Sequence, residues 1–200
     1  MNVNTLPEIT QSLKNWEAIR QNPAQLTLYL KQGTYFNVSF PEGAEYDVVH
    51  AYPGIDNGWL TYFVIPAMYD KPTCVNIQDY VQICPIMPAP LGQEIPEPEA
   101  KQRMTNWDDD MEQWIKKQVL TPEGMYQAFA IPGDDFQSTD YHIFLALRTA
   151  VNATGYVADL IIDDESGLTN ASAFFDTVRP VPPFKPYKKS AFYLLTLAEQ

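Results

Sequence analysis

The sequence predicts an α+β fold, with a mainly antiparallel sheet and about three helices packed on one side of it. Apolar residues recur at helical spacing near the start and in the middle of the 200-residue chain, whereas most of the remainder alternates at the strand period. The strand-like segments are joined mainly by short turns, which favours antiparallel neighbours. The length suits a single domain over residues 1–200, and the proline-rich stretch 85–98 is the place where it could be subdivided.

Two helices are expected before residue 34. The first begins at Thr5 and Glu8, which have capping-box spacing, and ends near Gln21. The second follows Asn22 and Pro23, a helix cap and the residue favoured at the first helical position. The leucines of this second segment also alternate at period two, so a strand stays open as the alternative there.

Most of the other elements are expected to be strands. A half-buried strand begins at Thr34, because its aromatic and β-branched residues alternate with polar ones. The Asn-Gly turn within residues 53–58 predicts a hairpin between the two strands that flank it. Prolines make the segment from Arg179 to Pro186 an extended edge or a surface loop. The remaining expected strands span residues 46–52, 59–65, 73–77, 81–86, 125–131, 141–148, 155–162, 171–178 and 190–197.

A third helix is expected to start at Thr105 or Asn106. This start places three aspartates, residues 108–110, in the first turn and two lysines, residues 116–117, in the last turn, where both complement the helix dipole. Consecutive helical side chains point about 100° apart, so the three aspartates cannot converge on one metal ion. The helix terminus therefore accounts for them without a bound cation.

The charge balance excludes several classes of partner. The chain has 25 acidic and 13 basic residues and a formal net charge of −12, which disfavours nucleic-acid phosphates and anionic membranes. No segment is apolar enough to span a bilayer, and the start lacks the features of an export signal, so a cytoplasmic location is expected. Cys74 and Cys84 match no common zinc spacing; they either face each other in a hairpin or stay reduced. No metal or cofactor is expected.

Candidate catalytic residues are few. The chain lacks a nucleotide-binding glycine motif and a recognisable nucleophile motif, which argues against an enzyme. His142, inside an apolar strand, is the best general base, and the acidic turns at Asp135 and Asp164 could supply carboxylates to it. These residues carry the alternative hypothesis of a hydrolase, or a small-ligand-binding protein, with an aromatic-lined cleft. Neither acidic turn has the alternating spacing of a calcium loop.

Aromatic residues and one basic strip are the candidate binding features. Tyr and Trp are favoured at protein interfaces, and the chain has 12 and 4 of them. The aromatic group expected at a binding surface consists of Trp59, Tyr62 and Tyr69. The basic, proline-rich strip contains Arg179, Lys185, Lys188 and Lys189. This strip either docks on the acidic side of its own chain or contacts a partner.

The leading hypothesis is a non-catalytic, acidic interaction protein. It would be an inhibitor, an immunity-like protein or a subunit of a larger assembly, because strong negative charge and many aromatic residues accompany the missing catalytic motifs. The expected partner is another protein, and the charge favours a basic one. A homo-oligomer stays open.

Overall fold

The computed structural model describes residues 5–88, 98–150, 155–164, 178–184 and 186–200. Its helices are α1 (Leu6–Ile19), α2 (Pro23–Leu30), α3 (Pro98–Gln118) and α4 (Tyr193–Ala198), with short 3-10 turns η1 (Ile77–Tyr80), η2 (Gly133–Asp135) and η3 (Lys189–Ala191). Its strands are β1 (Tyr35–Ser39), β2 (Val48–Asp56), β3 (Trp59–Pro66), β4 (Gln82–Pro85), β5 (Ala128–Pro132), β6 (Asp140–Thr149), β7 (Tyr156–Asp164) and β8 (Arg179–Val181). All strand pairs are antiparallel, in the orders β4-β3-β2-β5-β8 and β1-β6-β7, which confirms the α+β class.

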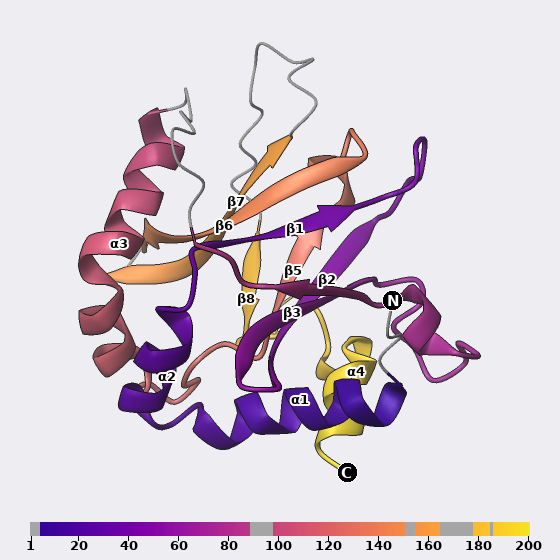
Figure 1. The fold of residues 1–200 in the computed structure, drawn as a ribbon, viewed down its shortest axis with the longest axis horizontal. Coiled ribbons are helices and arrows are strands. Elements are labelled where there is room, and N and C mark those ends of the chain that lie inside the picture. Colours follow the sequence, from indigo (N-terminus) through magenta and orange to yellow (C-terminus); the bar gives the residue numbers. More distant parts are fainter. Residues whose placement is uncertain (1–4, 89–97, 151–154, 165–177, 185) are drawn as a thin grey trace.

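The two sheets share one core and are joined along one edge (Figure 1). Just beyond β4, the Met87 amide donates to the Tyr35 carbonyl at 2.8 Å, and the Met87 carbonyl accepts from Thr34 at 2.8 Å. At the other edges, β7 and β8 lie close together without pairing. Pro180 in β8 has no backbone N–H to donate, so this strand is poorly equipped to close that seam.

Helices cover the outer faces of both sheets (Figure 1). The apolar stripe of α1 and the buried residues of α4 pack on the outer face of the five-stranded sheet. Ala100 and Met104, from the first half of α3, pack against Phe144 and Ile161 on the outer face of the three-stranded sheet. From Trp107 onward, the buried residues of α3 pack into the shared core. The helices thus lie on both sides of the molecule and not on one.

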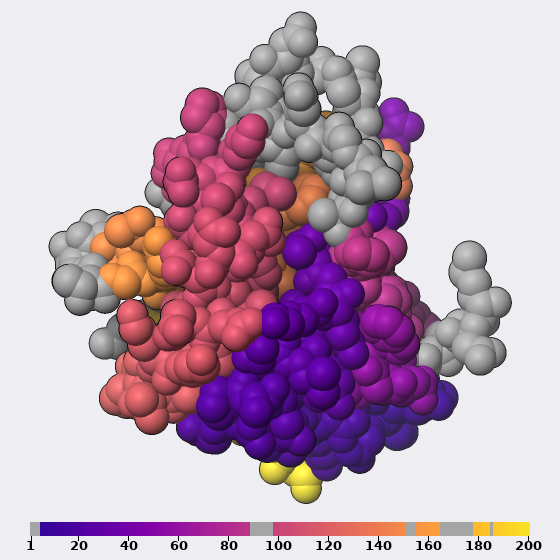
Figure 2. All heavy atoms as spheres, turned by 60° about the vertical axis from the view of Figure 1, so that its left-hand side comes forward, coloured from indigo at the N-terminus to yellow at the C-terminus, as the bar shows by residue number. Residues whose placement is uncertain are grey.

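The N-terminal helices follow the predicted caps. Glu8 accepts from the Thr5 backbone N–H at 2.7 Å, and Asn22 Oδ1 accepts from two amides at the start of α2. The predicted second helix is therefore confirmed at residues 23–30, and the strand alternative is wrong. Lys31, just after α2, forms an ion pair with Glu112 of α3, and Figure 2 shows α3 in rose lying against the indigo N-terminal helices.

The third helix begins seven residues before the expected Thr105. Pro98 starts it and Glu99 lies in its first turn, so the aspartates at 108–110 occupy the middle of α3 and the dipole explanation for them is wrong. Pro98 is the last residue of the proline-rich stretch 85–98, where the sequence predicts a connector, yet a proline is well tolerated at the first helical position. The predicted lysines 116–117 in the last turn are confirmed.

Two predicted strands are wrong. Residues 190–197 form η3 and α4, because a short apolar run fits a buried helix as well as a strand. Residues 73–77 form turns that lead into η1. Of the two alternatives for residues 179–186, the extended edge is confirmed for Arg179–Val181, which form β8. The strand expected at residues 171–178 lies outside the described residues except for Val178. Within the described ranges, no helix is both long and apolar enough to cross a membrane.

Candidate functional site

A hollow of about 980 Å³ opens where the loop before β2 meets the turn after β3 and the turn after β5. Its walls are residues 43–48, 67–68, 133–134 and 136–137. The central strand β2 pairs with both β3 and β5, and this pairing brings the three segments to the same end of the sheet. The sheet therefore positions a site whose parts lie far apart in the chain.

Backbone contacts hold these segments together. The Gly133 amide donates to the Asp47 carbonyl at 3.0 Å, and the Ala67 amide donates to the Val48 carbonyl at 2.9 Å. A Cβ on Gly133 would lie 1.4 Å from the backbone oxygen of Tyr46, so no larger residue fits there without moving the wall. The shape of the hollow is thus set by the backbone.

Two aromatic residues, Tyr46 and Phe136, line the hollow, and both pack against Phe40. Tyr46 lies 5.0 Å from Phe40 between ring centres, and Phe40 lies 4.9 Å from Phe136. Phe136 in turn meets Tyr141 edge-on at 5.1 Å. Burial raises the pKa of Tyr46, and its neighbour Tyr69 raises it further. Residues 67–68, which follow β3, line the same hollow as Tyr46.

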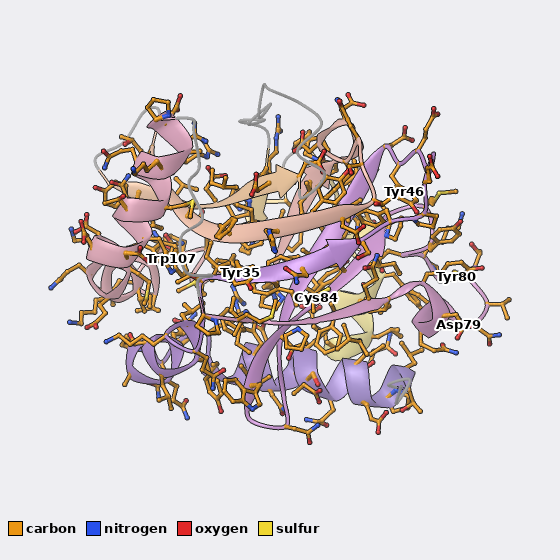
Figure 3. All side chains as sticks on the ribbon, turned by 45° about the horizontal axis from the view of Figure 1, so that its top comes forward. Tyr35, Tyr46, Asp79, Tyr80, Cys84 and Trp107 are labelled. Carbon is orange, nitrogen blue, oxygen red and sulfur yellow. The ribbon has the colours of Figure 1, made fainter. Side chains whose placement is uncertain are left out.

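An aromatic pair, half-buried Tyr69 and exposed Tyr80, lies next to the hollow in the segment that follows β3. Tyr69 and Tyr80 stack with ring centres 3.9 Å apart and planes 10° apart. Met68, in the wall of the hollow, is 53% exposed, and Tyr80 is 41% exposed. Figure 3 shows Tyr46, Tyr80 and the exposed Asp79 gathered at the same end of the molecule. This end therefore offers apolar contact area beside the hollow.

The walls carry negative charge. Glu45, Asp47 and Asp134 are exposed there, and the wall residues that the structure describes include no Lys, Arg or His. Asp135, between two wall residues, is buried, and neither of its carboxyl oxygens has a hydrogen-bond partner among the described residues. Burial raises the pKa of Asp135 to about 7, and the charge of Asp134 acts in the same direction. Carboxylates above aromatic faces attract cationic groups.

Sequence reasoning identified only part of this site. The turn containing Asp134 and Asp135 was expected as an acidic turn, but the walls at residues 43–48 and the stacking partner Tyr80 were missed. A local clue to the first wall is the polar, glycine-containing segment 41–45. Nothing local indicates that this segment meets the turn near residue 134, about ninety positions later along the chain.

The predicted aromatic group does not form one surface. Trp59 is 56% exposed at the start of β3, whereas Tyr69 follows the end of that strand, so the length of β3 separates them by roughly 20 Å. Tyr62 lies in the core, stacked on Phe36 at 4.3 Å, and its hydroxyl is 2.9 Å from that of Tyr126. Tyr62 is therefore not available to a partner.

The basic strip is divided between solvent and its own chain. Arg179 and Lys188 are exposed, and neither forms an ion pair with another described residue. Lys189 pairs with Glu199 and lies 6.0 Å from the ring centre of Phe184. This lysine therefore contacts its own chain, which is one of the two predicted alternatives for the strip. Lys185 lies outside the described residues.

The candidate catalytic residues do not converge on one face. His142 is directly opposite Asp163 in the β6–β7 ladder and 5.2 Å from the Tyr35 ring. Asp164, the next residue after Asp163, points to the other face of the sheet. Asp135 lies in η2, beside the acidic hollow. The structure thus places His142 and Asp164 on opposite faces of the three-stranded sheet.

A buried polar network involves the other histidine. His50 Nδ1 is 2.7 Å from Asp70 Oδ2, and the Tyr52 hydroxyl donates to the same oxygen. The second oxygen, Asp70 Oδ1, accepts from the backbone amide of Leu194 at 3.0 Å. Phe192 stacks on His50 at 4.2 Å between ring centres. Because all these side chains are buried, the network fastens the α4 segment to β2.

The structure gives no sign of a metal centre in the described ranges, where no three potential ligands come together. Cys74 and Cys84 are not bonded to each other. Burial raises the pKa of Cys84 to about 12, so its thiol stays protonated at neutral pH.

Comparisons with protein-family models, curated proteins and solved structures found no match to this chain.

Proposed function

We propose that this chain is a non-catalytic interaction protein that binds a cationic segment of another protein in the acidic hollow. The observation that supports this proposal is the wall composition: the exposed carboxylates of Glu45, Asp47 and Asp134 line the hollow together with two aromatic residues, and the wall residues that the structure describes include no cation. Arginine and lysine side chains pair with carboxylates and also pack on tyrosine faces. The hollow offers both contacts.

The volume of the hollow and the net charge of the chain support a cationic protein segment as the ligand. About 980 Å³ is at the upper end of what a single small molecule fills, and the adjoining Tyr69–Tyr80 pair extends the contact area beyond the hollow. The net charge of −12 attracts a cationic partner from a distance and raises the association rate at low salt. We therefore expect charge to guide the encounter and the aromatic residues Tyr46 and Phe136 to contribute affinity.

Paired charge reversals test the proposal. A hexa-arginine peptide is titrated calorimetrically into the wild-type protein and into the variant Glu45→Lys/Asp134→Lys. The matched control, Asp108→Lys/Asp109→Lys, changes two exposed aspartates of α3 and raises the net charge by the same amount. We expect the hollow variant to weaken binding by about tenfold or more, because like charges then face each other. The control should change affinity by roughly twofold at most.

Equal losses in both variants would show that the peptide responds only to net charge, and the proposal would then be wrong. Failure of the wild-type protein to bind the peptide at about 150 mM salt would also contradict it, because local carboxylate and aromatic contacts persist under that screening.

A further inference from the structure

Exposed apolar side chains are concentrated in the segment of residues 68–80, beside the acidic hollow. Six large hydrophobic side chains are exposed among the described residues, and three of them, Met68, Val75 and Tyr80, lie in this segment. Met68 is also a wall residue of the hollow. Exposed apolar area that is concentrated in one place is characteristic of an interaction surface.

A stacked tyrosine pair links this segment to the hollow. The Tyr80 ring lies parallel to the Tyr69 ring with centres 3.9 Å apart, so one face of Tyr80 is covered. Because Tyr80 is still 41% exposed, its accessible area comes from the opposite face and the edges. Burial, and after it the nearby Tyr69, raises the pKa of Tyr46, which lines the hollow. The open side of Tyr80 therefore lies at the same end of the molecule as the acidic hollow (Figure 3).

The backbone on both sides of this segment is anchored in the core. Asp70 accepts from the Leu194 amide at 3.0 Å, and its other carboxyl oxygen is 2.7 Å from His50 Nδ1. Ile77, three residues before Tyr80, is buried and packs in the apolar cluster on the outer face of the five-stranded sheet. The aromatic pair is therefore held on a fixed backbone, and little binding free energy is lost in ordering it.

The hollow and the segment beside it differ in charge. The described wall of the hollow has three exposed carboxylates, from Glu45, Asp47 and Asp134, and no cation. In residues 68–80 the exposed charged residues are Lys71 and Asp79, whose charges cancel. The basic groups of a ligand are therefore attracted to the hollow, whereas the area around Tyr80 offers apolar contact without a preference for charge.

We infer that the partner's cationic segment carries an aromatic side chain next to its basic residues, and that this side chain packs against Tyr80 and Met68. The inference rests on the proposed function, because it takes the acidic hollow as the place where the basic residues bind. A ring on the open face of Tyr80 adds favourable free energy beyond the area that it buries. The flexible thioether side chain of Met68 adapts to the shape of the incoming ring. A purely basic segment would leave this apolar area in water.

Two peptides of equal charge test the inference. One is hexa-arginine with a tryptophan at each end, and the other has serines in place of the tryptophans. Placing the residue at both ends makes the comparison independent of the direction in which the peptide binds. Each peptide is titrated calorimetrically into the wild-type protein at about 150 mM salt, where long-range attraction is screened. We expect the tryptophan peptide to bind about fivefold more tightly, the effect of one aromatic pair.

Three variants locate the contact. In Tyr80→Ser the preference for tryptophan should disappear, while the affinity for the serine peptide stays close to that of the wild type, because Tyr80 is not in the wall of the hollow. Tyr80→Phe keeps the ring and should keep the preference. The matched control, Trp59→Ser, removes an exposed aromatic side chain at the opposite end of β3 and should also keep it.

The inference is overturned if both peptides bind the wild-type protein equally well, and the proposed function then stands, because the serine peptide still binds. It is also overturned if the tryptophan peptide keeps its advantage in Tyr80→Ser, or if Trp59→Ser loses the advantage to the same extent. Failure of both peptides to bind the wild-type protein would contradict the proposed function, and the inference with it.

Discussion

Replacing Asp135 with asparagine should make the protein more stable than the wild type at neutral and alkaline pH. The carboxyl is buried and lacks a hydrogen-bond partner among the described residues, so its charged form is disfavoured in the folded state. Burial, with the neighbouring charge of Asp134, raises the pKa of Asp135 from 3.8 to about 7. The folded state therefore holds this proton more tightly than the unfolded state does.

The sign and size of the effect follow from that difference. For a group whose pKa is raised on folding, the stabilisation is complete below the unfolded pKa and is lost as pH rises through the folded one. With values of 3.8 and about 7, the wild-type protein loses about 2 to 3 kcal/mol of unfolding free energy between pH 5 and pH 8 on account of Asp135. An asparagine is neutral throughout and does not contribute this loss.

Thermal unfolding of both proteins at several pH values measures the effect. The difference in melting temperature between Asp135→Asn and the wild type should widen in favour of the variant by about 5 to 10 °C from pH 5 to pH 8. Asp134→Asn, at the exposed neighbour, should keep most of the pH-dependent loss but make it smaller, because burial is the main cause of the raised pKa of Asp135 and the charge of Asp134 is the second cause. Parallel profiles for Asp135→Asn and the wild type would refute the reasoning, because they would show that Asp135 does not titrate in this range.

Three further predictions concern the folded framework. Asp70→Ala removes the acceptor of the buried network, including that of the Leu194 amide, and should lower the unfolding free energy by about 3 to 5 kcal/mol in a urea titration; a loss below about 1 kcal/mol would contradict the described network. Gly133→Ala puts a Cβ 1.4 Å from the backbone oxygen of Tyr46, so this variant should have a lower melting temperature and weaker affinity for hexa-arginine. An unchanged melting temperature together with an unchanged affinity would show that the wall moves without loss of stability. Cys84, whose burial raises its pKa to about 12, should resist a thiol reagent near pH 8 until the protein unfolds; rapid labelling at Cys84 of the native protein, located by mass spectrometry, would be inconsistent with its burial.

Local sequence patterns correctly predicted the helix starts and the hairpin turn, whose geometry is determined by residues close together in the chain. The Thr5–Glu8 pair predicted the start of α1, and the cap at Asn22 favoured α2. Asn57 and Gly58 have positive φ angles of 48° and 84°, the conformation that the predicted Asn-Gly hairpin turn requires. In each case the residues that determine the geometry are neighbours in the chain.

Elements that depend on tertiary contacts were harder to predict. The segment of α4 has a short apolar run, and its conformation is decided by the burial of Phe192 over His50 and by the Asp70 contact, from 124 residues earlier, to Leu194. The early start of α3 is supported by Arg103, which meets Asp159 of β7 at 2.9 Å. Neither distant partner could be identified from a local pattern.

The acidic hollow also depends on contacts between residues that are distant in the chain, so the sequence predicts only part of it. Its acidic turn could be recognised in the sequence, but its walls come from three segments that meet only because β2 pairs with β3 on one side and β5 on the other. The predicted aromatic group failed for a related reason: Tyr62 and Trp59 both follow the strand pattern, and the pattern does not say that Tyr62 faces Phe36 in the core.

Chemical-shift mapping with the hexa-arginine peptide tests the proposed binding site most directly. In the complex at about 150 mM salt, we expect the largest backbone shifts within residues 43–48, 66–69 and 133–137, the segments that form and border the hollow. Shifts that spread evenly over the acidic surface, or that centre on residues 108–110 of α3, would contradict the conclusion that this hollow is where the protein binds a cationic partner.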